Sequence, residues 1–109
     1  MQINFQQLRT IMKESGLPVY RDEAPTTAKY PYIVYEFVNE QHKRASNSVL
    51  KSMPLYQIAV ITNGTEADIE PLKAVFNNSN VPYFQFDAIP FDEKDDTITQ
   101  FITLVRCVN

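Results

Sequence analysis

The sequence contains little of what most enzyme and metal sites are built from. It has a single cysteine, Cys107, a single histidine, His42, and only two glycines. One cysteine cannot form a disulfide within the chain or supply a zinc site of several thiolates. Two isolated glycines cannot form the glycine-rich loops that cradle nucleotide phosphates. These absences exclude a disulfide framework, a cysteine-rich zinc site and the common nucleotide-binding motifs.

The chain also lacks tryptophan, an excess of positive charge and any long apolar run. Its formal net charge is −3 and its pI is about 5.0, so the basic character of a typical nucleic-acid-binding domain is missing and no specific nucleic-acid binding is expected. No stretch approaches the ~20 apolar residues that span a bilayer, and the N-terminal segment does not resemble a signal peptide. We therefore expect a protein of a cytoplasm-like compartment with no membrane partner.

Apolar side chains are plentiful. Hydrophobic residues make up 44% of the 109 residues and include seven Phe and six Tyr. Burying large apolar side chains contributes about 1.5–3 kcal/mol each, which is enough to hold together a domain of this length. The composition thus predicts that residues 1–109 form a single ordered domain.

Helical periodicity is present in two segments. Asn4 and Gln7 have the spacing of a reciprocal N-terminal cap and predict a helix over residues 4–15, which Gly16 ends. A second helix ends at residues 77–80. Asp68 is favoured as its cap because Pro71 then lies in the first turn, and Thr65 remains an alternative. Residues 19–29 read as a loop with room for a short extended piece.

Four segments rich in β-branched and aromatic residues are predicted as strands. They are residues 30–38, 53–62, 83–89 and 97–108, and the polar segment 39–52 is either a long mobile loop or the arms of an extended hairpin. The order α-β-β-α-β-β predicts an α+β two-layer sandwich, in which two helices cover one face of a mainly antiparallel, four-stranded sheet. In the first strand the face with Ile33, Tyr35 and Phe37 is the more apolar, and we expect it to meet the helices.

No catalytic arrangement is visible along the chain. His42 lies in the polar 39–52 segment with Glu40 nearby but no nucleophile, so it reads as a solvated loop residue. The densest carboxylate cluster is Asp92, Glu93, Asp95 and Asp96. Its spacing does not match an EF-hand, and it reads as a charged hairpin tip. We expect no cofactor, no metal and no enzymatic activity.

Candidate interface residues fall into two charged groups and one aromatic group. Basic character gathers at His42, Lys43, Arg44 and Lys51, and acidic character gathers at Asp92, Glu93, Asp95 and Asp96. In a head-to-tail ring the basic segment of one copy could meet the acidic turn of the next. Tyr32 and Tyr56 are the candidate aromatic contacts, because tyrosine suits both sheet packing and protein interfaces.

The order of these segments resembles a known family. The pieces that carry the resemblance are PYIVYEF at residues 31–37, the YQIAVIT strand with its following helix, and the closing hairpin that ends TQFITLVRCV. Together they are similar to the small tail-terminator and tail-to-head joining proteins of long-tailed bacteriophages and prophages. The resemblance covers nearly the whole chain. It brings no catalytic residues with it.

The resemblance implies a virion structural protein. Such proteins form a ring, commonly a hexamer, on the end of the tail tube, where they stop tube growth and dock the head connector. The implied partners are further copies of the chain, the tail tube protein and a head completion or connector protein. The implied location is the virion tail, and the host cytoplasm during assembly. Two alternatives stay open: a small ligand-binding or enzymatic domain of ferredoxin-like type, and a regulatory protein that binds a protein partner.

Overall fold

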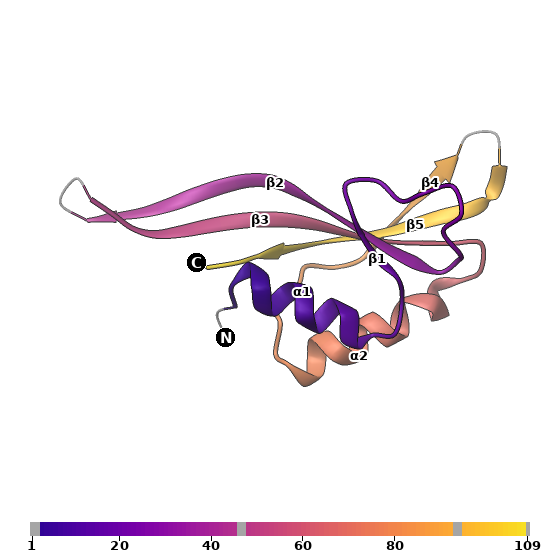
Figure 1. The fold of residues 1–109 in the computed structure, drawn as a ribbon, viewed down its shortest axis with the longest axis horizontal. Helices are drawn as coiled ribbons and strands as arrows, with labels where there is room; N and C mark the ends of the chain where they lie inside the picture. The colour runs from indigo at the N-terminus through magenta and orange to yellow at the C-terminus, as the bar shows by residue number, and fades with distance from the viewer. Residues whose placement is uncertain (1–2, 46–47, 93–94, 109) are drawn as a thin grey trace.

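The structure is a computed structural model and describes residues 3–45, 48–92 and 95–108. The element order is α1 (Phe5–Glu14), β1 (Val19–Arg21), β2 (Tyr32–Ala45), β3 (Ser48–Thr62), the 3₁₀ helix η1 (Glu66–Ile69), α2 (Glu70–Asn78), β4 (Asp87–Asp92) and β5 (Asp95–Arg106). Both α-helices lie on one side of a single sheet (Figure 1). The predicted α+β class with two helices is confirmed.

The sheet has five strands in the order β1-β2-β3-β5-β4, so the prediction of four strands was wrong. The additional strand, β1, pairs in parallel with the start of β2, from Val19 opposite Ile33 to Arg21 opposite Tyr35. All other pairings are antiparallel. A strand of three residues is too short to be recognised from its sequence alone. β1 forms because it pairs with the edge of β2.

The last hairpin is displaced from its predicted position. Residues 83–86 make only an isolated bridge, at Tyr83, and β4 begins at Asp87 and continues through Pro90 to Asp92. The strand predicted at residues 83–89 ends before Pro90. Pro90 is tolerated within β4 because β4 lies at the sheet edge, where one side of the strand needs no hydrogen-bond partner.

Local helix signals are mostly confirmed. Asn4 and Gln7 form the reciprocal cap of α1, with Gln7 N donating to Asn4 Oδ1 at 2.8 Å and Asn4 N donating to Gln7 Oε1 at 3.0 Å. Pro71 lies in the first turn of α2, as expected. The choice of Asp68 as the cap was wrong. Thr65 caps η1 instead, and α2 follows it directly.

The core lies between the helices and the sheet face formed by alternate residues of β2, β3 and β5. The fully buried side chains there are Leu8 and Met12 of α1, Leu72 and Phe76 of α2, and Ile33, Ile58, Val60 and Val105 of the sheet. Phe5 of α1 stacks on Tyr56 with ring centroids 4.7 Å apart. The helices therefore cover the face with Ile33 and Tyr35, as predicted, but Phe37 of the same predicted face is 49% exposed.

The hairpin of β2 and β3 is much longer than the rest of the sheet. The last β3 residue that pairs with β5 is Leu55, opposite Arg106. Beyond that pair, residues 40–45 and 48–54 pair only with each other and project as a two-stranded ribbon, which we call the arm (Figure 1). The molecule measures 52 × 29 × 23 Å. Of the two alternatives for the polar segment 39–52, its described residues form the arms of an extended hairpin.

Candidate functional site

The two predicted charged segments lie at opposite ends of the molecule. The arm extends to one side, and the β4–β5 hairpin forms the other end (Figure 1). Lys43 is the register partner of Lys51 in the arm, and Asp92 is the register partner of Asp95 in the β4–β5 hairpin. Glu93 lies outside the described residues.

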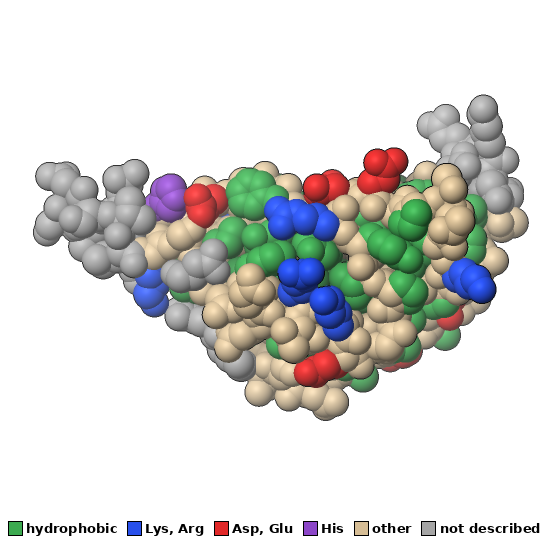
Figure 2. All heavy atoms as spheres, in the orientation of Figure 1, with side chains coloured by type: hydrophobic (Ala, Val, Ile, Leu, Met, Phe, Trp, Pro, Cys, Tyr) green, Lys and Arg blue, Asp and Glu red, His purple; other side chains and the backbone are tan. Residues whose placement is uncertain are grey.

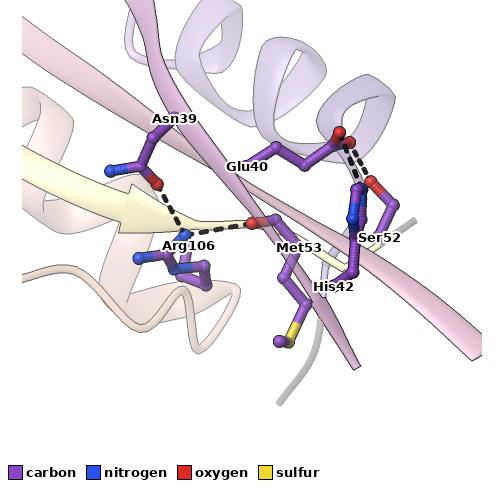
Figure 3. A network of polar contacts seen from close by, with 6 residues as sticks. All are labelled: Asn39, Glu40, His42, Ser52, Met53 and Arg106. Carbon is purple, nitrogen blue, oxygen red and sulfur yellow. Dashed lines mark hydrogen bonds and ion pairs between the residues drawn. The ribbon is translucent and has the colours of Figure 1, made fainter. Parts of the chain in front are cut away.

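The base of the arm is held by Arg106 at the end of β5. Its Nη1 donates to Asn39 Oδ1 at 3.1 Å and to the Met53 carbonyl at 3.0 Å (Figure 3). The backbone N–H of Cys107 donates to the Pro54 carbonyl at 2.8 Å. Together these contacts tie both strands of the arm to the C-terminal strand at the point where the five-stranded sheet ends.

His42 lies in a small polar network on the arm. Its Nε2 is 3.0 Å from Glu40 Oε2, and the Ser52 hydroxyl donates to Glu40 Oε1 (Figure 3). The Ser52 hydroxyl, and then the His42 ring, hold the pKa of the Glu40 carboxyl below its ordinary value. The carboxylate lies between the serine and the imidazole. The hydroxyl therefore bonds to the carboxylate and not to the imidazole, so the three residues do not have the Ser–His–carboxylate order of a nucleophilic triad.

The sheet face opposite the helices, which we call the open face, is only partly covered. The alternation of β3 and β5 places Leu55, Gln57, Ala59 and Ile61 on it, together with Gln100, Ile102 and Leu104. Ile102 and Leu104 are half-buried, and nearby Phe84 is 55% exposed. This face offers an apolar surface without a second layer over the middle of the sheet, which is typical of a protein contact.

Residues 22–31 cross part of the open face and create a pocket, which we call the open-face pocket. The pocket has a volume of about 450 Å³. Sheet residues form its floor, among them Tyr32, Glu36, Gln57 and Gln100, and its rim includes Asp22, Glu23, Tyr30 and Phe91. Figure 2 shows acidic side chains along the upper margin of the molecule, on the side away from the helices. Among the described residues, no lysine, arginine or histidine lines this pocket.

The two candidate tyrosines are both buried. Tyr32 is 7% exposed and lies beneath Tyr30, whose ring is stacked at 5.6 Å, and burial is the main cause that raises the pKa of Tyr32. Tyr56 is also 7% exposed and belongs to the helix-covered face. Tyr30, at 39%, is the accessible aromatic beside Tyr32. A partner could therefore contact Tyr32 only inside the open-face pocket.

Sequence reasoning did not identify the open-face pocket. The sequence indicated part of the pocket lining, because strand alternation places Tyr32, Val34 and Glu36 on one face. Gln57 and Gln100 are polar residues on otherwise apolar strands, and both line the pocket, with Gln57 Nε2 donating to Glu36 Oε1 at 3.0 Å. What the sequence did not indicate is that residues 22–31 lie over these side chains.

Membrane and metal sites can be assessed for the described part of the chain. Neither α1 nor α2 has the length and apolar character needed to cross a bilayer. Within residues 3–45, 48–92 and 95–108, no three His, Cys, Asp or Glu side chains gather where they could bind a metal ion. Cys107 is fully buried, and desolvation raises the pKa of its thiol to about 11.

Comparison with known proteins identifies a fold but no family. No family model matches the sequence, and no curated protein matches it. Among solved structures, a chain from the structure described as "Virion of native gene transfer agent (GTA) particle" matches with a TM-score of 0.59 and 15% sequence identity. The match covers 96% of this chain and 91% of that chain. The two chains therefore share a fold along nearly their whole lengths.

Proposed function

We propose that this chain is a virion structural protein of a tailed bacteriophage or a phage-like particle. The observation that carries the proposal is the shared fold with a chain of a gene transfer agent virion, which extends over 96% of the present chain. The resemblance of the 31–37 strand and the segments after it to tail-terminator proteins supports the same assignment. The protein would act by assembly and docking, without turnover.

Within the virion, the proposed role is that of a tail terminator or tail-to-head joining protein. Copies would assemble as a ring, in this family commonly a hexamer, on the end of the tail tube. One side of the ring would contact the tube protein and stop its growth, and the other would dock the head completion or connector protein. The location would be the virion tail, and the host cytoplasm during assembly.

The distribution of charge supports head-to-tail assembly. A basic arm with Lys43, Arg44 and Lys51 lies at one end, and an acidic hairpin with Asp92, Asp95 and Asp96 lies at the other. A contact between unlike ends is heterologous, and such contacts close into rings when the rotation between copies allows it. The partly uncovered open face, with Ile102, Leu104 and Phe84, would supply apolar area for a neighbouring virion protein.

The test is electron microscopy of particles from a phage that lacks this protein. We expect tails of irregular length that are not joined to heads, with both defects reversed when the intact gene is supplied in trans. Tails of normal, uniform length joined normally to heads would refute the proposed role. Intact heads made by the same phage serve as the internal control, because head assembly should not need a tail-end protein.

A further inference from the structure

The hydroxyl of Tyr32 is a polar group of the open-face pocket that the fold leaves without a partner. Tyr32 is 7% exposed and lines the pocket. Within the described residues its hydroxyl makes no hydrogen bond, and no side-chain N or O atom that is fully shielded from solvent lacks a partner. The hydroxyl is therefore open to solvent at the pocket, which is the surface that Tyr32 lines. A nearly buried hydroxyl of this kind is satisfied by water or by a ligand.

Two further groups of the pocket can accept hydrogen bonds. Gln100 of β5 is half-buried, and its side-chain amide makes no hydrogen bond within the part of the chain that the structure describes. The exposed Glu36 uses one carboxylate oxygen, Oε1, to accept from Gln57, so Oε2 is available to a ligand. A hydroxyl, an amide oxygen and a carboxylate oxygen from two strands thus face one hollow, and together they suit a ligand with several donors.

The charge of the pocket favours a positively charged ligand. Asp22, Glu23 and Glu36 line it, and no described lysine, arginine or histidine does. Asp22 lies 4.0 Å from the Arg21 guanidinium, with both side chains more than half exposed. Glu23 and Glu36 have no ion pair within the described residues. Carboxylates gathered around one hollow attract positive charge and disfavour negative charge.

Aromatic rings make the pocket more specific for a flat cation. The Tyr30 ring, on a side chain that is 39% exposed, stacks on Tyr32 with centroids 5.6 Å apart, and Phe91 adds an exposed ring at the rim. The faces of aromatic rings attract cations, and the attraction increases when the cation is partly removed from water. A guanidinium group is planar, stacks on rings and carries five donors in a fixed geometry, whereas an ammonium group is a compact point charge.

The segment over the pocket is held in place by its own backbone. Asp22 N donates to the Tyr35 carbonyl at 2.8 Å where the segment leaves β1, and Ala28 N donates to the Pro25 carbonyl at 2.9 Å within it. The pocket is thus formed before any ligand arrives, and binding does not have to order this segment at a cost in entropy.

From these features we propose that the open-face pocket binds an arginine side chain carried by another protein of the virion. Two of the three arginines whose side chains are described are engaged within the chain. The Arg21 guanidinium lies 5.7 Å from the centroid of the Phe5 ring, and Arg106 bonds at the base of the arm. The third, Arg9, lies on α1. Because the chain has a net charge of −3, a second copy adds repulsion, and a more basic protein is the better match.

A peptide titration tests the site on the purified, isotope-labelled full chain. The probe is a capped Gly-Arg-Gly tripeptide, and its control replaces arginine with citrulline, which has nearly the same shape without the charge. At millimolar concentration the arginine peptide should shift the NMR signals of the Gln57 and Gln100 side-chain amides. The citrulline peptide should bind about tenfold more weakly. Free putrescine, a small diamine, should bind no more tightly than the arginine peptide.

Variants separate the contributions of charge and hydroxyl. Glu36→Gln removes one charge while its amide oxygen can still accept from Gln57, and it should weaken binding of the arginine peptide about tenfold. Tyr32→Phe should weaken binding about threefold without lowering the thermal stability of the free chain, because the lost hydroxyl has no protein partner. Glu14→Gln, on α1 and on the helix side of the sheet, makes the same charge change as Glu36→Gln and should leave binding unchanged.

Several results would overturn the inference. They are an absence of shifts at about 10 mM arginine peptide, equal binding of the citrulline peptide, and binding that Glu36→Gln leaves unchanged. Tighter binding of putrescine would assign the pocket to a small amine instead. Self-association of the unlabelled chain that Glu36→Gln weakens about tenfold would assign the pocket to a second copy.

The identity of the partner rests on the proposed function, and a phage experiment addresses it. Glu36→Lys should lower the yield of complete particles about tenfold, and second-site revertants should replace an arginine in another virion protein. A normal yield, or revertants that map only to this chain, would contradict the choice of partner. The peptide titration does not depend on the virion. Its failure would leave the deletion phenotype intact, and normal tails in the deletion experiment would leave the titration result intact.

Discussion

Arg106 and Asn39 are 67 positions apart in the sequence, and their side chains are joined by a hydrogen bond of 3.1 Å. The contact lies where β5 ends and the arm continues alone. It fixes the direction in which the arm leaves the sheet, because the same guanidinium nitrogen also bonds to the Met53 carbonyl in the other strand of the arm. One residue of β5 thus bonds to both strands at the base of the arm.

The first prediction concerns this anchor. Arg106→Ala should destabilise the fold by only about 1 kcal/mol, since the hydrogen bonds it loses are partly exposed. It should raise amide hydrogen exchange in the arm near Asn39 and Met53 more than in the helices. Arg106→Lys retains the charge, but its ammonium lacks the planar fork of donors and should restore the anchor only in part. Arm exchange that is unchanged in Arg106→Ala would show that β-pairing alone fixes the arm.

A second prediction concerns the charge of the arm. Replacing both Lys43 and Arg44 with glutamate should weaken self-association about tenfold at low salt, because repulsion replaces attraction at the acidic end of the neighbour. The difference from wild type should shrink as salt is raised toward 1 M, where the Debye length falls to ~3 Å. The matched control replaces Arg9 and Lys13 on α1, which makes the same change in net charge. Sedimentation across a salt series is the measurement, and unchanged oligomers would count against the contact.

The turn after β3 gives a third prediction. Thr62 Oγ1 donates to Asp68 Oδ2 at 2.5 Å and accepts from Gly64 N at 2.9 Å. A Cβ added at Gly64 would lie 2.3 Å from the same carboxylate oxygen. Gly64→Ala should therefore displace Asp68 from Thr62 and cost about 1–3 kcal/mol of unfolding free energy in urea.

A double-mutant cycle checks the cause of that loss. Once Asp68→Ala has removed the carboxylate, Gly64→Ala should cost clearly less than it does alone, because the clash no longer exists. Gly16→Ala is the control. Its added Cβ meets open space, and its cost of roughly 1–2 kcal/mol arises from a φ of +83°. The cost of Gly16→Ala should be the same with and without the Asp68 carboxylate. If Asp68→Ala reduced the costs of the Gly64 and Gly16 substitutions equally, the explanation would be contradicted.

The fourth prediction follows from burial of the single thiol. Burial raises the pKa of Cys107 to about 11 from an ordinary value of 9.0. At pH 8 the thiolate fraction should be about 100-fold lower in the folded protein than in the unfolded chain, and alkylation by iodoacetamide should be slower by at least that factor. The thiol favours the folded state below pH 9, and this contribution is lost as the pH rises through about 11. Rapid native labelling at pH 8 would show that the C-terminal segment opens readily.

Sequence reasoning succeeded where structure is decided by neighbours in the chain. The cap formed by Asn4 and Gln7, the place of Pro71 in a first turn and the apolar face with Ile33 and Tyr35 all depend on spacings of two to four residues. The two charged segments could also be identified, since net charge is a property of composition.

The errors have a common physical cause. β1 is a strand only because β2 lies beside it, and Pro90 is tolerated in β4 only because β4 is at an edge. The open-face pocket brings Asp22, Glu36 and Gln100 together from different parts of the chain. Such features depend on pairing between distant segments and on the path of a loop, which no local pattern contains.

Beyond its base, where Arg106 and Cys107 bond to the Met53 and Pro54 carbonyls, the described part of the arm continues from the fold as a two-stranded ribbon. Residues could be added to or removed from it in matched sets, two in each strand, without disturbing the helices or the core. Each residue changes the reach of a strand by about 3.4 Å, and even-numbered steps keep every side chain on its original face. If copies assemble as proposed, a change in arm length would change the separation between neighbouring copies without altering the rest of the fold, and the same fold could then fit tail tubes of different circumference.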